Sequence, residues 1–282
     1  MKKTVLYIIF IFAAFLLLFP VVFMVVNSFM NEAEVISVYN TISNVENIIK
    51  QQYISLNLIP ESVGLTQYYR ILFRDPTFLV MFWNSVVLTV PIILGQIFVS
   101  MLGGYAFAKI NFPFRNQIFF VFIVVMLMPY QVTLVSNYII LSKMSLIGSY
   151  LSIILPSMFS TFGVFLLRQF IRSIPNEYCE SAKIDGAGHF IIFRSIIVPQ
   201  CKAGIASLAI LSFIDNWNMV EQPLIFLKDI FKYPMSIFLS QINTSELGVA
   251  FACGVLYMLP AILIYLYGEE YLVIGIQLSG IK

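Results

Sequence analysis

Charge is scarce in this sequence of 282 residues. Charged residues make up 11% of the chain and hydrophobic residues 60%, whereas a soluble domain is about 25% charged and about 45–50% apolar. The formal net charge is +2, which is too small for the basic surface that binds nucleic acid. The composition therefore excludes an ordinary soluble protein and a nucleic-acid-binding protein, and it predicts a chain embedded in membrane lipid.

Cysteine and histidine are also scarce, with three cysteines and one histidine in the chain. Cys179 and Cys201 fall in a predicted cytoplasmic loop and Cys253 in a predicted span, so we predict no disulfide. His189 could act as a pH sensor or a ligand, but a surface position is the simpler interpretation. The sequence offers no cluster of metal ligands and no nucleophile paired with a base.

Phosphate-binding motifs are missing as well. The pattern G-x-x-x-x-G-K-[ST] occurs nowhere in the chain. We therefore expect the chain to bind no ATP, to hold no cofactor or metal, and to be no enzyme by itself.

Long apolar runs, by contrast, are abundant. Five stretches contain no charged residue and are long enough to cross a bilayer, which takes roughly 20 apolar residues in a helix. A sixth, Ala203–Leu227, is interrupted by Asp215 and Glu221. Because backbone amides in lipid must be satisfied within the segment, these runs predict helices. We expect an all-α polytopic membrane protein of one domain, 1–282, with spans at about residues 5–29, 78–108, 117–141, 150–171, 203–228 and 247–274.

The distribution of lysine and arginine predicts the orientation. Ten of the sixteen fall on the side that carries both termini and the loop 172–202, and six fall on the other side. The more basic side is expected to be cytoplasmic. The run Val5–Val26 is too long for a signal peptide, so we interpret it as a retained first span. The chain is therefore expected in the cell membrane with both termini in the cytoplasm and with an external segment at 31–77.

Within the external segment, apolar residues recur at a spacing of three and four over residues 32–50. The pattern predicts an amphipathic helix. Two interpretations stay open: a helix that lies on the membrane or on its own bundle, and a contact for a partner protein.

The loop 172–202 is too long for an ordinary connection between helices, which takes about 2–8 residues. Pro175 suits a first helical turn, and Glu177 and Glu180 favour a helix N-terminus. Gly186 can take the left-handed conformation that ends a helix, and Pro199 would stop a second one. The pattern predicts two short helices around a glycine.

This loop resembles the EAA loop of ABC importer permeases, whose pattern is Glu-Ala-Ala, then Asp-Gly-Ala, then Leu-Pro. The matching positions are Glu180, Ser181, Ala182, Asp185, Gly186, Ala187, Val198 and Pro199. Departures are Ser181 for the second alanine, Val198 for leucine, and Ala203 where a second proline is common. The resemblance implies that Glu180, Ser181, Ala182, Asp185, Gly186 and Ala187 couple the chain to a cytoplasmic ATPase.

The resemblance extends over roughly residues 55–282 and points to carbohydrate permeases of the maltose type. It includes Asn84-Ser85, the run Gly104–Lys109, Met128–Gln131, Phe165–Phe170 and the tail Leu278–Lys282. It implies the type I importer permease fold with a coupling helix between spans four and five. It also implies four kinds of partner: a second homologous permease, an ABC ATPase dimer that binds ATP and Mg²⁺, an extracellular sugar-binding protein, and the sugar.

Span five carries a polar stripe. Ser212, Asp215, Asn218 and Gln222 fall within an arc of roughly 120° on a helix, and Trp217 offers a neighbouring ring. Ionisable groups in a span usually face a cavity or protein, so we predict that this stripe lines the substrate path, together with Gln131 and Asn137 of span three. The alternative is that these polar groups hold two permeases together.

Two competing functions stay open. The chain could import another solute, such as a polyamine or a peptide. A secondary transporter would show broken helices at matching positions of an internal repeat, and no such pairing is visible. The sequence names neither the sugar nor the subunit that contacts it.

Overall fold

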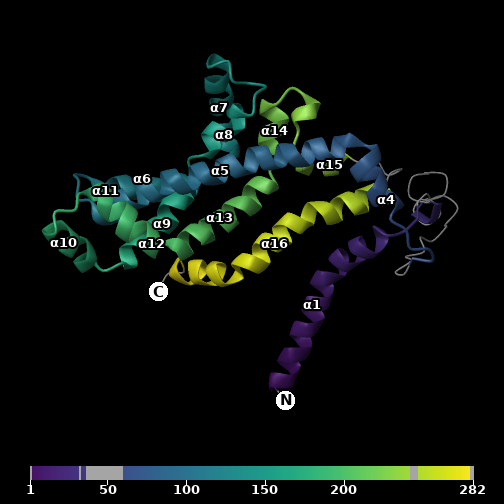
Figure 1. Ribbon diagram of the computed structural model, residues 1–282, viewed down its shortest axis with the longest axis horizontal. Coiled ribbons are helices and arrows are strands. Elements are labelled where there is room, and N and C mark those ends of the chain that lie inside the picture. The colour runs from purple at the N-terminus through teal and green to yellow at the C-terminus, as the bar shows by residue number, and fades with distance from the viewer. Residues whose placement is uncertain (1, 32, 36–59, 242–246, 280–282) are drawn as a thin grey trace. The chain divides into compact units, whose positions relative to one another are not determined.

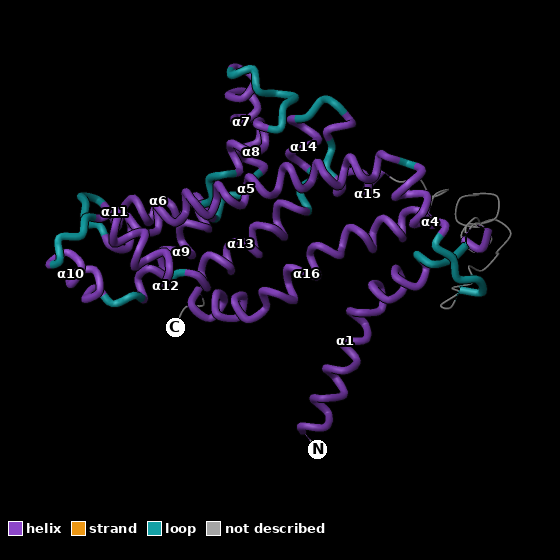
Figure 2. The backbone as a smooth tube through the Cα atoms, in the orientation of Figure 1, coloured by secondary structure: helices purple, strands orange, loops and turns teal. Residues whose placement is uncertain are grey.

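The computed structural model describes residues 2–31, 33–35, 60–241 and 247–279, and this part of the chain is built of helices and loops (Figure 1). It divides into two compact units, one formed by residues 1–83 and 235–260, the other by 84–234 and 261–282. Figure 2 shows helices joined by short loops, with no strand among the described residues. The expected all-α class is therefore confirmed.

The first unit begins with a helix that is apolar on all sides. Its side chains are largely exposed over the span Lys3–Asn27, as expected of a helix that faces lipid or a partner. Near its end, Phe23 packs edge-on against Phe251 at 6.0 Å between ring centroids. Of the amphipathic helix expected over 32–50, only residues 33–35 lie among those described. The unit contains α1 (Lys2–Asn27), α4 (Thr66–Tyr69), the π-helix η1 (Arg70–Arg74), α15 (Met235–Gln241), and parts of α5 (Pro76–Lys109) and α16 (Leu247–Ser279).

The second unit contains the rest of α5 and α16 and every other element. These are α6 (Arg115–Met126), α7 (Gln131–Lys143), α8 (Leu151–Ser157), α9 (Thr161–Ser173), α10 (Asn176–Ile184), α11 (His189–Ile192), the π-helix η2 (Phe193–Ile197), α12 (Val198–Gln200), α13 (Lys202–Trp217), α14 (Glu221–Phe226) and the 3-10 helix η3 (Ile230–Lys232).

Small residues let the helices of this unit pack closely. A side chain on Gly104 of α5 would meet the backbone of Leu167 and Arg168 in α9 at 3.0–3.2 Å. A side chain on Gly204 of α13 would meet the ring of Phe170 in α9 at 2.7 Å. Packing among helices in lipid depends on such close approach, because no hydrophobic force drives helices together there.

The described residues contain between four and six candidate membrane spans. Four helices are long and apolar enough to cross a membrane: Lys3–Asn27, Pro76–Lys109, Leu151–Ser173 and Leu247–Val273. Two further candidates are bent pairs, α6 with α7 at 101° and His189–Gln200 with α13 at 72°. The six-span count stays a prediction.

Two expected spans are interrupted. The stretch 117–141 breaks after Met126, and Pro129 lies in the gap before α7, where its missing N–H and its ring oppose a continuous helix. The stretch 203–228 breaks after Trp217, where α13 ends, and a separate helix, α14, follows at Glu221–Phe226. At this break the side-chain Nδ2 of Asn218 donates to the carbonyl of Ile214 at 2.8 Å, which satisfies an acceptor at the end of α13.

Candidate functional site

Helix α10 ends in the left-handed turn that the glycine predicts. Gly186 has φ +84°, its N–H donates to the carbonyl of Lys183 at 3.0 Å, and the N–H of Ala187 donates to the carbonyl of Ala182 at 2.8 Å. This pair of hydrogen bonds defines a Schellman motif. The predicted helix end is therefore confirmed, and the motif residues Ala182, Gly186 and Ala187 form one rigid corner.

The polar members of the motif face outward. Glu180, Ser181 and Asp185 are exposed, while Ala182 and Ala187 are half-buried. Ile184 is 87% exposed although it is apolar, which is costly unless another surface covers it. The outer side of α10 thus presents two carboxylates beside an uncovered aliphatic side chain.

The inner side of the loop belongs to the core of the second unit. Cys179, Ile192 and Ile197 are buried in one cluster with Phe170 of α9 and Leu208 of α13. Because the loop shares a core with the helices, it cannot move independently of them.

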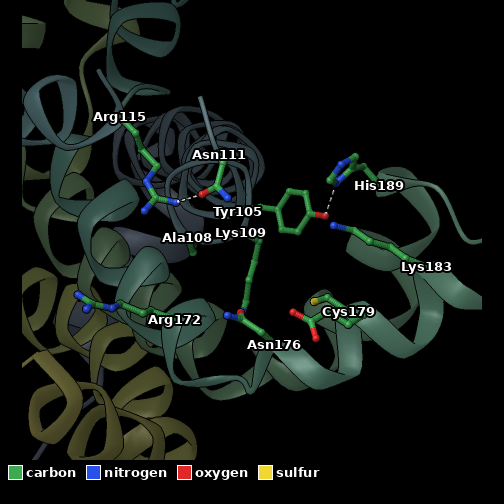
Figure 3. Close-up of a pocket in the computed structure, with 11 residues that line it drawn as sticks. Tyr105, Ala108, Lys109, Asn111, Arg115, Arg172, Asn176, Cys179, Lys183 and His189 are labelled. Carbon is green, nitrogen blue, oxygen red and sulfur yellow. Dashed lines mark hydrogen bonds between the residues drawn. The ribbon is translucent and has the colours of Figure 1, made fainter. Parts of the chain in front are cut away.

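Two side chains near the end of α5 attach to this loop (Figure 3). The Nζ of Lys109 donates to the carbonyl of Ile174 at 2.6 Å and to Oδ1 of Asn176 at 2.7 Å. The hydroxyl of Tyr105 lies 3.0 Å from Nδ1 of His189. The single histidine is exposed, as expected, but it also joins α11 to α5.

A cavity of about 520 Å³, lined by both polar and apolar side chains, opens among α5, α6, α7, α8, α9, α13 and α14. Ser212, Asp215 and Gln222, from the polar stripe of predicted span five, line it, and Asn137 lines it from α7. A cavity of this size can hold a small ligand. The structure thus brings together four of the residues predicted for the path.

A second cavity of about 370 Å³ shares Asp215 and Gln222 with the first and adds Gln131 and Asn218. The Nε2 of Gln131 donates to both carboxylate oxygens of Glu221, at 3.0 and 3.1 Å. This contact joins α7 to α14, which lie close together in Figure 1.

The ring of Trp217 lies outside both cavities. It is 2% exposed and stacks on Phe213 at 5.1 Å between centroids, so its role beside the path stays a prediction. Other lining residues escaped sequence reasoning, among them Gln96, Tyr130 and Ser157. Gln96 and Ser157 could have been noticed as polar residues in apolar runs, and Gln96 shares one face of α5 with Ser85, Thr89 and Ser100.

Comparisons with known proteins identify the family of the chain. Residues 76–273 match the family described as binding-protein-dependent transport system inner membrane component. The arabinooligosaccharides transport system permease protein AraQ of Halalkalibacterium halodurans is 25% identical over 97% of this chain and 94% of its own length. AraQ of Bacillus subtilis is 28% identical over 81% of this chain and 83% of its own length.

A third relative matches a shorter stretch at a higher sequence identity. The sn-glycerol-3-phosphate transport system permease protein UgpE of Salmonella typhi is 34% identical over 54% of each chain. Among solved structures, the crystal structure of a bacterial ABC transporter involved in the import of the acidic polysaccharide alginate includes a chain with a TM-score of 0.80, 19% identity and 96% coverage of both chains. The fold is therefore shared with an importer. The family match covers well over half of this chain, and the chain therefore belongs to the binding-protein-dependent transport system inner membrane components.

Proposed function

We propose that the chain is a membrane subunit of an ATP-driven importer for a sugar or oligosaccharide that an extracellular binding protein delivers. The observation that carries this proposal is the match to an arabinooligosaccharide permease over 97% of the chain, a length that includes both the loop and the cavity residues. In this proposal ATP and Mg²⁺ are bound by a separate ATPase, and the chain forms one half of the pathway.

The cavity chemistry supports a neutral substrate rich in hydroxyl groups. The side chains that line the two cavities include serine, threonine, asparagine and glutamine, and the carboxylates of Asp215 and Glu221. Neither cavity is lined by lysine or arginine. Carboxylates accept strong hydrogen bonds from hydroxyl groups, whereas they would repel a phosphate ester or an acidic sugar.

The outward side of α10 is the surface that would contact the ATPase. Glu180 and Asp185 can accept hydrogen bonds from basic groups of a partner, and Ile184 would lose its 87% exposure in a cleft. Movement of this cleft on the ATPase would then be transmitted from α10 to the membrane helices through Lys109, Tyr105 and the buried core that the loop shares with them. This mechanism requires the loop, and with it both termini, to lie in the cytoplasm.

A second permease would cover the apolar side chains that α7 exposes. Val132, Val135 and Ile139 are 56%, 69% and 50% exposed and lie near the polar cavities. A homologous subunit placed there would close the cavities from the open side and complete the pathway, as a heterodimer in the cell membrane.

A cationic solute such as a polyamine is the second candidate, because Asp215 and Glu221 would attract it. A secondary-transport mechanism finds less support, since the matching family is one of binding-protein-dependent systems. A peptide finds less support because the relatives described above are permeases for arabinooligosaccharides and sn-glycerol-3-phosphate.

The test is uptake into proteoliposomes that contain this chain with its partner permease, the ATPase and the binding protein. We expect ATP-dependent uptake of an arabinooligosaccharide, and no uptake of spermidine or sn-glycerol-3-phosphate. Uptake of spermidine in place of the sugar would support the cationic candidate. Uptake that does not require ATP would overturn the importer assignment.

A further inference from the structure

A third cavity, of about 440 Å³, lies between the loop 172–202, called the coupling loop below, and the ends of α5, α6 and α9 (Figure 3). Four basic side chains line it, Lys109, Arg115, Arg172 and Lys183, and one carboxylate, that of Glu180. Four positive charges against one negative charge leave an excess of three positive charges when His189 is neutral. The cavity is therefore suited to an anion.

No hydrogen bond or ion pair to a carboxylate among the described residues neutralises this excess charge. The hydrogen bonds of Lys109 go to a carbonyl and an amide oxygen, and Arg115 donates to Oδ1 of Asn111 at 2.9 Å. Arg172 and Lys183 make no hydrogen bond or ion pair with the described residues. Among the described residues, the acceptors that Lys109 and Arg115 use are thus uncharged, and the excess positive charge would attract an anion from outside the chain.

The position of the cavity favours a lipid as the source of that anion. Lys109 is the last residue of α5, Arg115 the first of α6, and Arg172 lies in the last turn of α9. Basic side chains where apolar helices end lie at the level of lipid headgroups. The cytoplasmic leaflet carries anionic lipids, and basic pockets between spans on that side bind their headgroups.

Apolar side chains are exposed on and beside α6, the helix that begins at Arg115. Phe114, next to Arg115, is 71% exposed, and Phe120 and Val121 further along are 64% and 56% exposed. These side chains could contact acyl chains while the phosphate stays among the basic groups. A soluble anion has no apolar part that could contact these side chains.

We propose that this cavity binds the phosphate group of an anionic phospholipid of the cytoplasmic leaflet, with the acyl chains against α6. Arginine and lysine form charge-assisted hydrogen bonds with phosphate oxygens, and the volume of about 440 Å³ accommodates a headgroup. The inference rests on the proposed orientation of the loop and is independent of the substrate that is imported.

The test compares two charge-removing variants of the assembled importer. Arg172→Gln with Lys183→Gln removes two cavity charges without breaking a hydrogen bond to a described residue. Arg194→Gln, exposed on η2 and outside the cavity, is the matched control. Each complex is placed in nanodiscs of phosphatidylcholine with phosphatidylglycerol, extracted, and examined by native mass spectrometry for retained phosphatidylglycerol. We expect retention to fall at least fivefold in the double variant and to stay at the wild-type level in the control.

Three outcomes would overturn the proposal. Equal retention of phosphatidylglycerol by the wild type, the double variant and the control would show that the cavity is not a lipid site. If inorganic phosphate in lipid-free detergent raised the melting temperature of the wild-type complex as much as phosphatidylglycerol does, the site would be one for a free anion. If only complexes without the ATPase retained the lipid through these residues, an acidic group of the ATPase would be the occupant. Retained ATP-dependent uptake in the double variant would keep the proposed function intact in each case.

Discussion

The hydroxyl of Tyr105, near the end of α5, lies 3.0 Å from Nδ1 of His189, the first residue of α11. The same tyrosine ring packs on Phe193 at 5.4 Å between centroids. One residue of a membrane helix therefore contacts α11 and η2, the first two helical segments after Gly186. Motion of the loop should pass to α5 through this contact.

Tyr105→Phe removes the hydrogen bond and keeps the ring. A buried neutral hydrogen bond contributes about 1 kcal/mol, roughly a fivefold effect on an equilibrium. We expect normal assembly with the ATPase and a several-fold fall in sugar transported per ATP hydrolysed, measured in proteoliposomes. Tyr138→Phe on α7 is the control, because none of the described residues bonds its hydroxyl. An unchanged ratio in Tyr105→Phe would show that the hydrogen bond transmits nothing.

Gly186→Leu tests the corner of the coupling loop. None of the described residues lies within 4 Å of the position where its side chain would begin, so among them the backbone φ of +84° is the obstacle. A side chain in this conformation costs about 1 kcal/mol or more, and its bulk would also disturb docking. We expect a folded, inserted protein with reduced co-purification of the ATPase and reduced uptake.

Gly188→Leu provides the matched comparison. Gly188 has equally open surroundings but an ordinary φ of −73°. It should bind the ATPase close to the wild-type level. Equal loss in both variants would mean that bulk rather than backbone conformation matters, and normal uptake in Gly186→Leu would remove the coupling role.

The loop could be predicted from sequence because its determinants are local. Gly186 and Pro175 act on the backbone of their own neighbours, and the structure places α10 and its turn at the expected positions. The prediction that Pro199 stops the second helix was wrong, because Pro199 lies inside α12, in the first turn of a helical segment where its missing N–H is tolerated. The polar stripe was partly predictable for the same reason, since helical periodicity brings Ser212 and Asp215 to one face.

Long-range packing could not be predicted in this way. Asn84 was singled out only by resemblance, yet its Nδ2 donates to the carbonyls of Phe231 and Tyr233, and its Oδ1 accepts from Tyr150. These partners lie 66–149 residues away in the sequence. The basic cavity is similar, because Lys109, Arg115 and Arg172 come from three helices whose ends meet only in the fold.

Topology is best tested with introduced cysteines. The three native thiols are buried, and burial raises the pKa of Cys201 in the loop to about 11, so almost none of it is the reactive thiolate at neutral pH. Native Cys179 and Cys201 should therefore resist labelling from either side.

Ile184→Cys and Val63→Cys, at positions 87% and 77% exposed, supply the probes. We expect a membrane-impermeant maleimide to label Val63→Cys in intact cells, and Ile184→Cys only after the cells are opened. Labelling of Ile184→Cys from outside would invert the orientation and remove the proposed ATPase contact.

Gly104→Ala tests the crossing of α5 and α9. The added carbon would lie 3.0 Å from the backbone nitrogen of Arg168, which cannot rotate away. Overpacking of this kind costs about 1–3 kcal/mol, so the melting temperature of the complex should fall. In Gly103→Ala the added carbon meets only the side chain of Val164, which can adjust, and that variant should melt close to the wild type. Equal melting of both variants would contradict the close crossing.

Asp215→Ala distinguishes the pathway from an interhelical contact. The carboxylate is exposed, lines both polar cavities and makes no hydrogen bond with the described residues. Its removal should therefore leave expression and assembly intact. Hydrogen bonds to a charged group contribute about 1.5–3 kcal/mol, so we expect sugar uptake to fall roughly tenfold to a hundredfold. Stimulation of the ATPase by the loaded binding protein should survive better, since the coupling loop is untouched.

The companion variant is Glu221→Ala, which breaks the hydrogen bonds from Gln131 and should loosen α7 from α14. In this variant we expect a lower melting temperature of the purified complex, a change that Asp215→Ala should not produce. Loss of the second permease from Asp215→Ala during purification would instead support the contact interpretation, because the partner's polar group would be left unpaired. Unchanged uptake and unchanged assembly in Asp215→Ala would eliminate both roles. The pathway role requires impaired uptake by a complex that stays intact.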